Sequence, residues 1–155
     1  MTGPAVMLRP GRPDDAAVLR DLTWRLTIAH PAYGDQARAR PQAVEAPTQA
    51  LSDGGVIVAE VEGRAVGYVT VVQGEEDAAE VDGLFVDADF QRGGIGRRLL
   101  EAAADTARRR GASGLRVVSA PDAVAVYEAF GFGDPEATQT LFGPAVILRM
   151  ALPPQ

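Results

Sequence analysis

The chain has 155 residues, 46% of them hydrophobic, so it can bury the core of a single domain, which we expect to span residues 1–155. The absence of cysteine and lysine, together with a single histidine, excludes disulfides, a P-loop or Schiff-base lysine and a multi-histidine metal centre. The net charge of −6 argues against nucleic acid as a partner, and the lack of a long apolar run or apolar leader argues against a membrane and favours a cytoplasmic protein.

The first third of the chain predicts a strand, a helix and an irregular segment. Residues 5–9 are expected to form a short strand and residues 12–30 a helix, with His30 as an ordinary loop residue. Helical spacing places four apolar residues on one face of that helix: Val18, Leu19, Leu22 and Leu26. Residues 32–51 hold at most one short helix, because two prolines interrupt them.

The middle of the chain predicts consecutive strands. Residues 54–74 form two β-rich runs around Glu62-Gly63-Arg64, which is typical of a hairpin. A third strand is expected from about Glu80 to Val86.

An amphipathic helix is expected to begin near Gly94. Its apolar stripe consists of Leu99, Leu100, Ala103 and Ala107, and its polar face predicts the ion pairs Arg97–Glu101 and Asp105–Arg109. The remainder predicts a strand at 115–120, a short helix at 122–130 and one or two strands within 140–152. Strands and helices alternate, which is typical of an α/β fold with a mixed sheet.

Three glycines, Gly93, Gly94 and Gly96, lie where the chain passes from a predicted strand to this helix. The first amides of a helix have no acceptor within it and form a natural anion site, and glycine lets a phosphate approach them closely. Residues 91–110 carry six arginines and two acids, a local charge of +4 in an acidic chain. The pattern favours a phosphate-bearing ligand, although a tight turn beside a solvated arginine face explains the same residues.

Residues 91–96, QRGGIG, match the Gln/Arg-x-x-Gly-x-Gly/Ala motif of the GNAT superfamily of acyl-CoA-dependent N-acetyltransferases. Residues 126–132, VYEAFGF, resemble the second signature of that family, at a matching separation. The resemblance covers nearly the whole chain. It implies an α/β fold with a mixed, partly antiparallel central sheet of seven strands, and four helices on its two faces. The implied order is strand, two helices, three strands, helix, strand, helix, two strands.

The resemblance also implies a site for acetyl-CoA as the cosubstrate. Backbone amides of the glycine turn would hold the diphosphate, and the strand before it would pair with the pantetheine arm beside a β-bulge near Gly83. The implied residues are Leu84, Phe85, Val86, Gln91, Arg92, Gly93, Gly94, Ile95, Gly96 and Arg97.

Tyr127 matches the tyrosine that in many family members protonates the departing thiolate. A tyrosine that only packs on the coenzyme or the sheet is the alternative. Where many members carry an asparagine that contacts the coenzyme, this chain has Ala120, and Ser119 or Asp122 are the candidates to replace that contact.

Two acids on the strand before the motif, Glu80 and Asp82, are candidates for the base that deprotonates an acceptor ammonium, directly or through water. Some family members carry a catalytic glutamate at the position of Glu80. Both acids also belong to an acidic run within residues 75–89, and such runs are usually only solvated surface. Near a site, the same acidity favours a cationic acceptor.

The resulting hypothesis is an acetyl-CoA-dependent N-acetyltransferase that acetylates a primary amine of a small molecule or peptide by direct attack in a ternary complex. A non-catalytic acyl-CoA-binding or sensor module is the alternative, and a nucleotide-binding domain is a third interpretation. No motif identifies the acceptor, although Trp24 and Tyr33 are candidates to line its pocket or to pack in the core. The terminal strands are candidates for pairing two copies as a homodimer.

Overall fold

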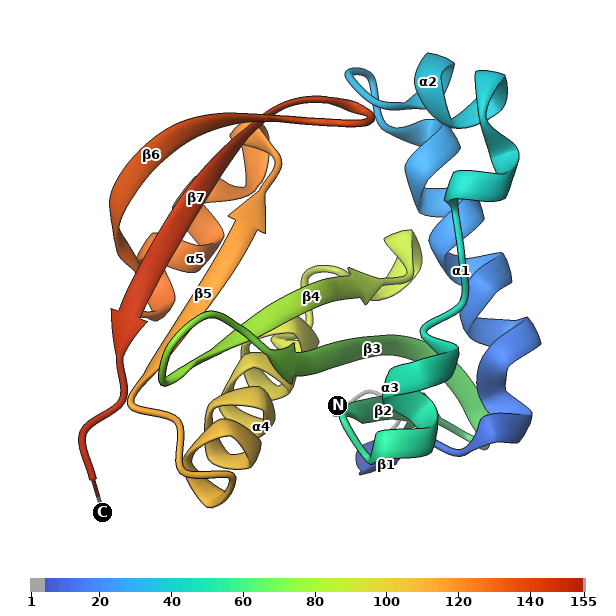
Figure 1. Ribbon diagram of the computed structural model, residues 1–155. Helices are drawn as coiled ribbons and strands as arrows, with labels where there is room; N and C mark the ends of the chain where they lie inside the picture. Colours follow the sequence, from blue (N-terminus) through green and yellow to red (C-terminus); the bar gives the residue numbers. More distant parts are fainter. Residues whose placement is uncertain (1–4, 155) are drawn as a thin grey trace.

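The computed structural model describes residues 5–154 and contains one seven-stranded sheet with helices on both sides (Figure 1). The order of the strands is β1-β2-β3-β4-β5-β7-β6; β4 and β5 are parallel, and the other neighbours are antiparallel. The elements are β1 (Val6–Pro10), α1 (Ala16–Ala29), α2 (Gly34–Ala39), α3 (Thr48–Asp53), β2 (Val56–Val61), β3 (Arg64–Gln73), β4 (Ala78–Val86), α4 (Ile95–Arg109), β5 (Gly114–Ser119), α5 (Val124–Phe130), β6 (Gly133–Thr140) and β7 (Gly143–Ala151).

The first strand and helix lie where the sequence predicts them, within a few residues. Helix α1 buries Leu19 and Leu22 against the sheet, as expected from their spacing. Val18, however, is 52% exposed, so its place in the predicted apolar stripe is wrong. The buried face is centred on Leu19 and Leu22, and the preceding residue lies about 100° around the helix from Leu19.

The segment between α1 and β2 contains two short helices, α2 and α3, where the sequence predicted at most one. Pro41 begins a 3₁₀ turn after α2, and Pro47 occupies the N-cap of α3. Proline fits the first turn of a helix but not its interior, so the two prolines divide the segment.

The predicted hairpin between β2 and β3 is confirmed. Its two turn residues, Glu62 and Gly63, have φ values of +51° and +78°. Two positive φ values in a two-residue loop are the signature of a type I′ turn, whose twist matches that of the flanking strands.

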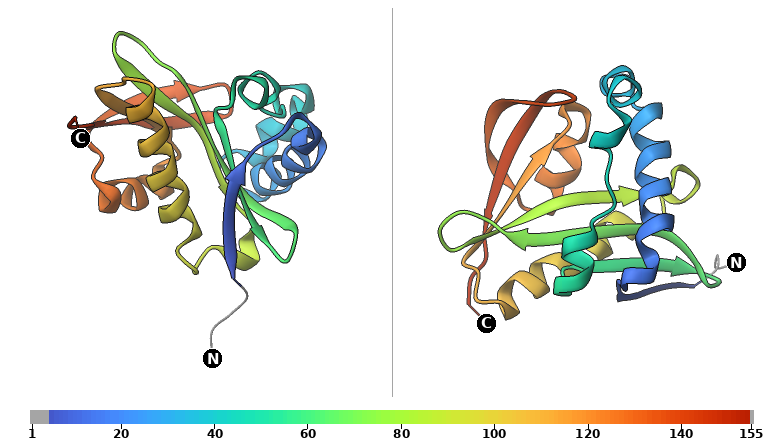
Figure 2. Two further views of the ribbon diagram at one scale, coloured as in Figure 1. Left: turned by 90° about the horizontal axis from the view of Figure 1, so that it is seen from below. Right: turned by 45° about the vertical axis from the view of Figure 1, so that its right-hand side comes forward.

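The sheet separates two apolar layers. Helices α4 and α5 cover one face, and α1 to α3 cover part of the other, as the view from below shows (Figure 2, left). The four predicted stripe residues of α4 are buried in the first layer: Leu99, Leu100, Ala103 and Ala107. Arg97 pairs with Glu101 at 3.3 Å as predicted, but Asp105 pairs with Arg108 at 3.1 Å rather than with Arg109. Spacings of three and four residues both bring side chains together on a helix, so the sequence pattern could not decide between them.

A β-bulge lies in the middle of β4, one residue earlier than expected. Thr70 pairs with Gly83 and Val71 pairs with Val81, so Asp82 is the extra residue. The parallel pairing of β4 with β5 runs only from Ala78 to Val81, and beyond that point the two strands diverge (Figure 1). The bulge bends β4 and thereby separates the two strands at the centre of the sheet.

Among the helices of residues 5–154, none combines the length and hydropathy that a bilayer crossing requires.

Candidate active site

Helix α4 begins with backbone amides that have no backbone acceptor. Gly94 occupies the N-cap with φ of +80°, a left-handed conformation that suits glycine. Within residues 5–154, the amides of residues 94–97 donate to no backbone oxygen, whereas Arg98 N donates to Gly94 O at 3.1 Å. Such amides carry partial positive charge at the start of a helix. The turn therefore has the geometry of an anion site.

The glycines of this turn leave open the space in front of these amides. A Cβ added at Gly96 would meet no heavy atom within 4 Å, and at Gly93 it would meet only Phe90 O, at 3.8 Å. Of the three, only Gly94 needs glycine for its backbone conformation. The fold itself does not explain glycine at Gly96, but close approach of a bulky anion does, so these residues fit the diphosphate of coenzyme A.

The side chains of the motif differ in their exposure and in the groups that they contact. Ile95 is buried in the core, so only its amide is available to a ligand. Gln91 turns back toward β4, and its Nε2 donates to Val86 O at 2.9 Å. Arg97 pairs with Glu101 and lies over the ring of Phe130, whereas Arg92 is exposed. The backbone of the turn is therefore the main binding element.

The end of β4 presents one backbone edge toward the divergence from β5. Its residues Leu84, Phe85 and Val86 pair with β3 on their other edge. Leu84 and Val86 pack into the α4 layer, and the Phe85 ring lies 5.3 Å from that of Tyr68 in the α1 layer. Their side chains thus serve the core, and the pairing of their backbone with a pantetheine arm stays a prediction.

Tyr127 lies in α5 with its ring in the core. It is 7% exposed, and its ring meets the edge of Phe132 at a centroid distance of 5.6 Å. Its hydroxyl makes no hydrogen bond with any group of residues 5–154, so it is free to donate to a ligand. Burial raises the pKa of Tyr127 to about 12, which keeps the phenol protonated at neutral pH.

The two residues proposed to replace the missing asparagine already have partners. The Ser119 hydroxyl is buried and donates to Ala120 O at 2.7 Å. Asp122 lies 3.0 Å from His30 Nε2. Both side chains are thus engaged with other groups, so the structure supplies no clear substitute at Ala120.

The two candidate bases differ in their surroundings. Glu80 forms an ion pair with Arg116 on the neighbouring strand β5. Asp82, at the bulge, has no ion-pair partner among the described residues. The side chain of Asp82 is exposed, but the protein around it partly desolvates the carboxylate and raises its pKa, and the nearby charge of Glu80 raises that pKa further. Asp82 is therefore the more available proton acceptor of the two.

Two further polar residues, Tyr68 and Thr23, lie near Asp82 on the α1 side of the sheet. The Tyr68 hydroxyl and Thr23 Oγ1 are hydrogen-bonded, and burial raises the pKa of Tyr68 to about 12. The charge of Asp82 also raises the pKa of Tyr68, so these groups lie close together on the α1 side. Sequence reasoning missed Tyr68 and Thr23, because they lie 45 residues apart and match no motif.

The loop between α1 and α2 meets the turn between β6 and β7. Tyr33 donates its hydroxyl to Pro144 O at 2.8 Å, and its ring stacks on His30 at 4.4 Å. His30 lies in the loop after α1, as expected, and its Nε2 also contacts Asp122 at 3.0 Å. Tyr33 thus links the loop between α1 and α2 to the start of β7, whereas Trp24 is only partly buried and lies beneath Arg20.

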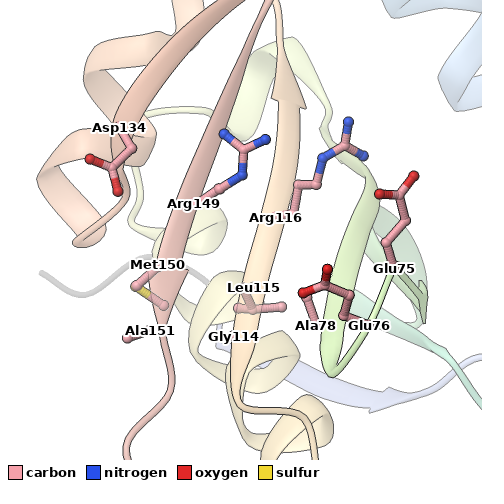
Figure 3. A pocket seen from close by; sticks show the side chains of 10 residues that line it. All are labelled: Glu75, Glu76, Ala78, Gly114, Leu115, Arg116, Asp134, Arg149, Met150 and Ala151. Carbon is pink, nitrogen blue, oxygen red and sulfur yellow. The ribbon is translucent and has the colours of Figure 1, made fainter.

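A hollow of about 420 Å³ lies elsewhere on the sheet (Figure 3). Residues from the start of β5, the end of β7 and the turn before β4 line it. Arg116 and Arg149 come from adjacent strands and lie side by side in it. It contains none of the motif residues, and it lies at the end of β5 opposite Ser119. Its link to the site is Arg116, the partner of Glu80.

Besides the partly buried Glu80, Asp87 of the acidic run is not solvated surface. Asp87, which follows β4, is only 4% exposed and contacts Arg25 and Arg64. The sequence pattern suggested an exposed acid, because no base lies within the run itself. Both arginines come from distant segments.

Comparison with known proteins gives a consistent picture. Residues 19–132 match the sequence profile of the acetyltransferase (GNAT) family. No functionally curated protein matches the chain in sequence.

Solved structures share the fold over almost the entire chain. PaiA N-acetyltransferase from Thermoplasma acidophilum, in complex with coenzyme A, has a TM-score of 0.74 at 17% identity and covers 95% of this chain and 99% of its own. Ard1 from Thermoplasma volcanium has a TM-score of 0.72 at 18% identity, covering 96% and 99%. A GCN5-related N-acetyltransferase from Rhodopseudomonas palustris has a TM-score of 0.73 at 24% identity, covering 98% of both chains. Since the family profile spans most of the chain and the fold agrees, this chain belongs to the acetyltransferase (GNAT) family.

Proposed function

We propose that this protein is an N-acetyltransferase that takes the acetyl group from acetyl-CoA and transfers it to a primary amine of a small molecule or peptide. The observation that carries the proposal is the start of α4, where four amides without backbone acceptors face a space that the glycines keep open. The relative from Thermoplasma acidophilum was solved with coenzyme A, which supports the same ligand here.

The coenzyme would be held mainly by the backbone of this chain. The amides of residues 92–97 would bind the diphosphate, and the free edge of β4 at residues 84–86 would pair with the amides of the pantetheine arm. This arrangement would direct the thioester toward the bulge at Asp82 and toward Tyr127. When bound, acetyl-CoA supplies an activated acyl group with a thiolate as the leaving group.

Asp82 is the proton acceptor that we propose, because Glu80 is already paired with Arg116. Asp82 takes one proton from the acceptor ammonium, directly or through water, and frees the nitrogen lone pair. The nitrogen then forms a bond to the carbonyl carbon, the carbon–sulfur bond breaks with its electrons on sulfur, and the second proton of the attacking nitrogen passes to solvent. No residue of the chain needs to carry the acetyl group, in keeping with the absence of cysteine.

Tyr127 would stabilise the departing sulfur. With its pKa raised to about 12, the phenol is fully protonated when the reaction starts. Complete transfer of its proton to a thiolate with a pKa near 8.5 would cost roughly 5 kcal/mol. Donation of a hydrogen bond to the sulfur is therefore the main role of Tyr127, and solvent supplies the proton that leaves with the thiol.

The acceptor that we propose is cationic. Two carboxylates, Glu80 and Asp82, lie at or beside the bulge, and the whole chain has a net charge of −6. Such a field concentrates cationic amines and speeds their association, most strongly at low ionic strength.

A second candidate is an acyl-CoA-binding sensor without turnover, favoured by Ala120 at the usual asparagine position and by the engagement of Ser119 and Asp122 with other groups. Calorimetry with coenzyme A, followed by a thiol-release assay with acetyl-CoA and a panel of amines, separates the possibilities. Binding with thiol release above the amine-free rate supports the transferase. Binding without release from any amine supports the sensor, and absence of binding refutes both.

A further inference from the structure

The acid that ends β4 is buried at the base of the coenzyme turn. Asp87 has its side chain 5% exposed, and its carboxylate accepts the amide of Asp89 at 3.1 Å. Its own amide donates to Val66 O at 2.7 Å, and its carbonyl accepts the amide of Phe90 at 2.8 Å. Asp87 therefore fixes both the end of the strand and the first residues of the turn.

Two arginines from separate elements meet this carboxylate. Arg25 of α1 approaches it at 3.4 Å and Arg64 of β3 at 3.3 Å, although both arginine side chains are at least half exposed. A buried carboxylate is costly unless it is paired and hydrogen-bonded, so the two cations and the Asp89 amide together make the burial tolerable. Exposed ion pairs contribute little stability by themselves, so stability alone is a weak reason for this cluster.

The cluster is connected to the free amides by a short stretch of chain. Residues 88–90 form a 3₁₀ turn whose N-cap is Asp87, and Arg64 also lies over the ring of Phe90 at 6.0 Å. Beyond it, Gly93 N points to Phe90 O at 3.5 Å, a weak contact, so the rest of the turn has little internal support. The position of the turn at residues 91–94, next to the amides at the start of α4, thus depends on how firmly the 3₁₀ turn is held.

We propose that Asp87 is a positioning residue for coenzyme binding, which holds the turn at residues 88–94 so that the amides at the start of α4 converge on the diphosphate. Arg25 and Arg64 are its counterions and link the turn to α1 and β3. This inference rests on the proposed function, because it assigns the turn to coenzyme A. Asp87 itself does not touch the ligand in this assignment.

The test compares variants of the full chain by calorimetry with coenzyme A and by amide hydrogen exchange without ligand. Asp87→Ala removes every side-chain contact, and we expect it to weaken coenzyme A binding about tenfold. Asp87→Asn keeps an acceptor for the Asp89 amide, so it should restore part of the affinity. Asp105→Asn, which breaks an exposed ion pair on α4, is the matched control and should bind as the wild type does.

Hydrogen exchange separates positioning from general destabilisation. In Asp87→Ala, exchange should accelerate at the hydrogen-bonded amides of residues 87, 89, 90 and 98 and stay unchanged in the core strands. Wild-type affinity in this variant, or a uniform loss of protection across the sheet, would overturn the inference. If Asp87→Ala does not fold, the double variant Arg25→Gln/Arg64→Gln replaces it. We expect this variant to bind coenzyme A about threefold more weakly, and unchanged affinity would overturn the inference. A wild-type protein that gives no heat with coenzyme A would instead refute the proposed function.

Discussion

Replacement of Gly96 by alanine should stabilise the fold and weaken coenzyme binding at the same time. Gly96 lies in the first turn of α4, outside the left-handed region, and an added Cβ meets no heavy atom within 4 Å. Alanine is favoured over glycine in a helix by about 0.5–1 kcal/mol. For a chain of this size, that gain corresponds to an increase in Tm of roughly 1–4 °C.

The same methyl group would stand in front of the amides that we assign to the diphosphate. Displacing the anion weakens one or two hydrogen bonds to a charged group, each worth about 1.5–3 kcal/mol, so affinity should fall about 10- to 100-fold. The assay is thermal unfolding with and without coenzyme A, combined with calorimetry. Gly133→Ala on β6 is the control, because its Cβ also meets open space but lies outside the motif.

Opposite signs for stability and affinity are the diagnostic result. A Gly96→Ala protein that binds coenzyme A as tightly as the wild type would refute the assignment of the turn. A variant that loses stability and affinity together would show that Gly96 serves the fold. Gly94→Ala should behave in that second way, because its φ of +80° costs an alanine about 1–2 kcal/mol.

Asp82→Asn should lower kcat by about 100-fold or more with a small effect on coenzyme affinity, and Glu80→Gln should lower it less; the reverse order in steady-state kinetics would transfer the role of base to Glu80. Because partial desolvation raises the pKa of Asp82, ionisation of this side chain destabilises the folded wild type. The destabilisation is absent below the ordinary pKa of about 4 and complete above the raised pKa. Asp82→Asn should therefore raise Tm at pH 7 but not at pH 3. Tyr127→Phe should lower kcat about tenfold and leave Tm within about 2 °C. The variant should also lose the alkaline limb of the pH–kcat profile, which should lie above about pH 11 because the pKa of Tyr127 is about 12. Equal kcat values for the wild type and the variant would leave Tyr127 only a packing role. Arg9 lowers the pKa of Asp15, so their pair stabilises above the ordinary pKa and less as the pH falls through the lowered one. Asp15→Asn should therefore lower Tm at pH 7 and hardly at pH 2, and a pH-independent difference in thermal scans would contradict this.

Features set by local chemistry were predictable from the sequence. The turn at Glu62-Gly63 depends on two adjacent residues, and the buried face of α4 depends on a repeat within one helix. The glycine turn was recognised for the same reason, since the amides at the start of a helix are unpaired whatever surrounds them.

Features set by distant contacts were not predictable. Asp87 looked like one more solvated acid, because its partners Arg25 and Arg64 lie 62 and 23 residues away. The contact of His30 with Asp122 spans 92 residues. The choice between Glu80 and Asp82 likewise depended on Arg116 of the adjacent strand, which strand order alone brings into reach.

The early end of the pairing between β4 and β5 has a practical consequence for handling the protein. Beyond Val81 and Val117, the facing edges of the two strands are not paired with each other, and Asp82 is the one charged residue along them. An open edge accepts any extended peptide that reaches it. Preparations concentrated without acetyl-CoA should therefore self-associate or retain contaminating peptides. Adding acetyl-CoA before concentration should keep them monodisperse.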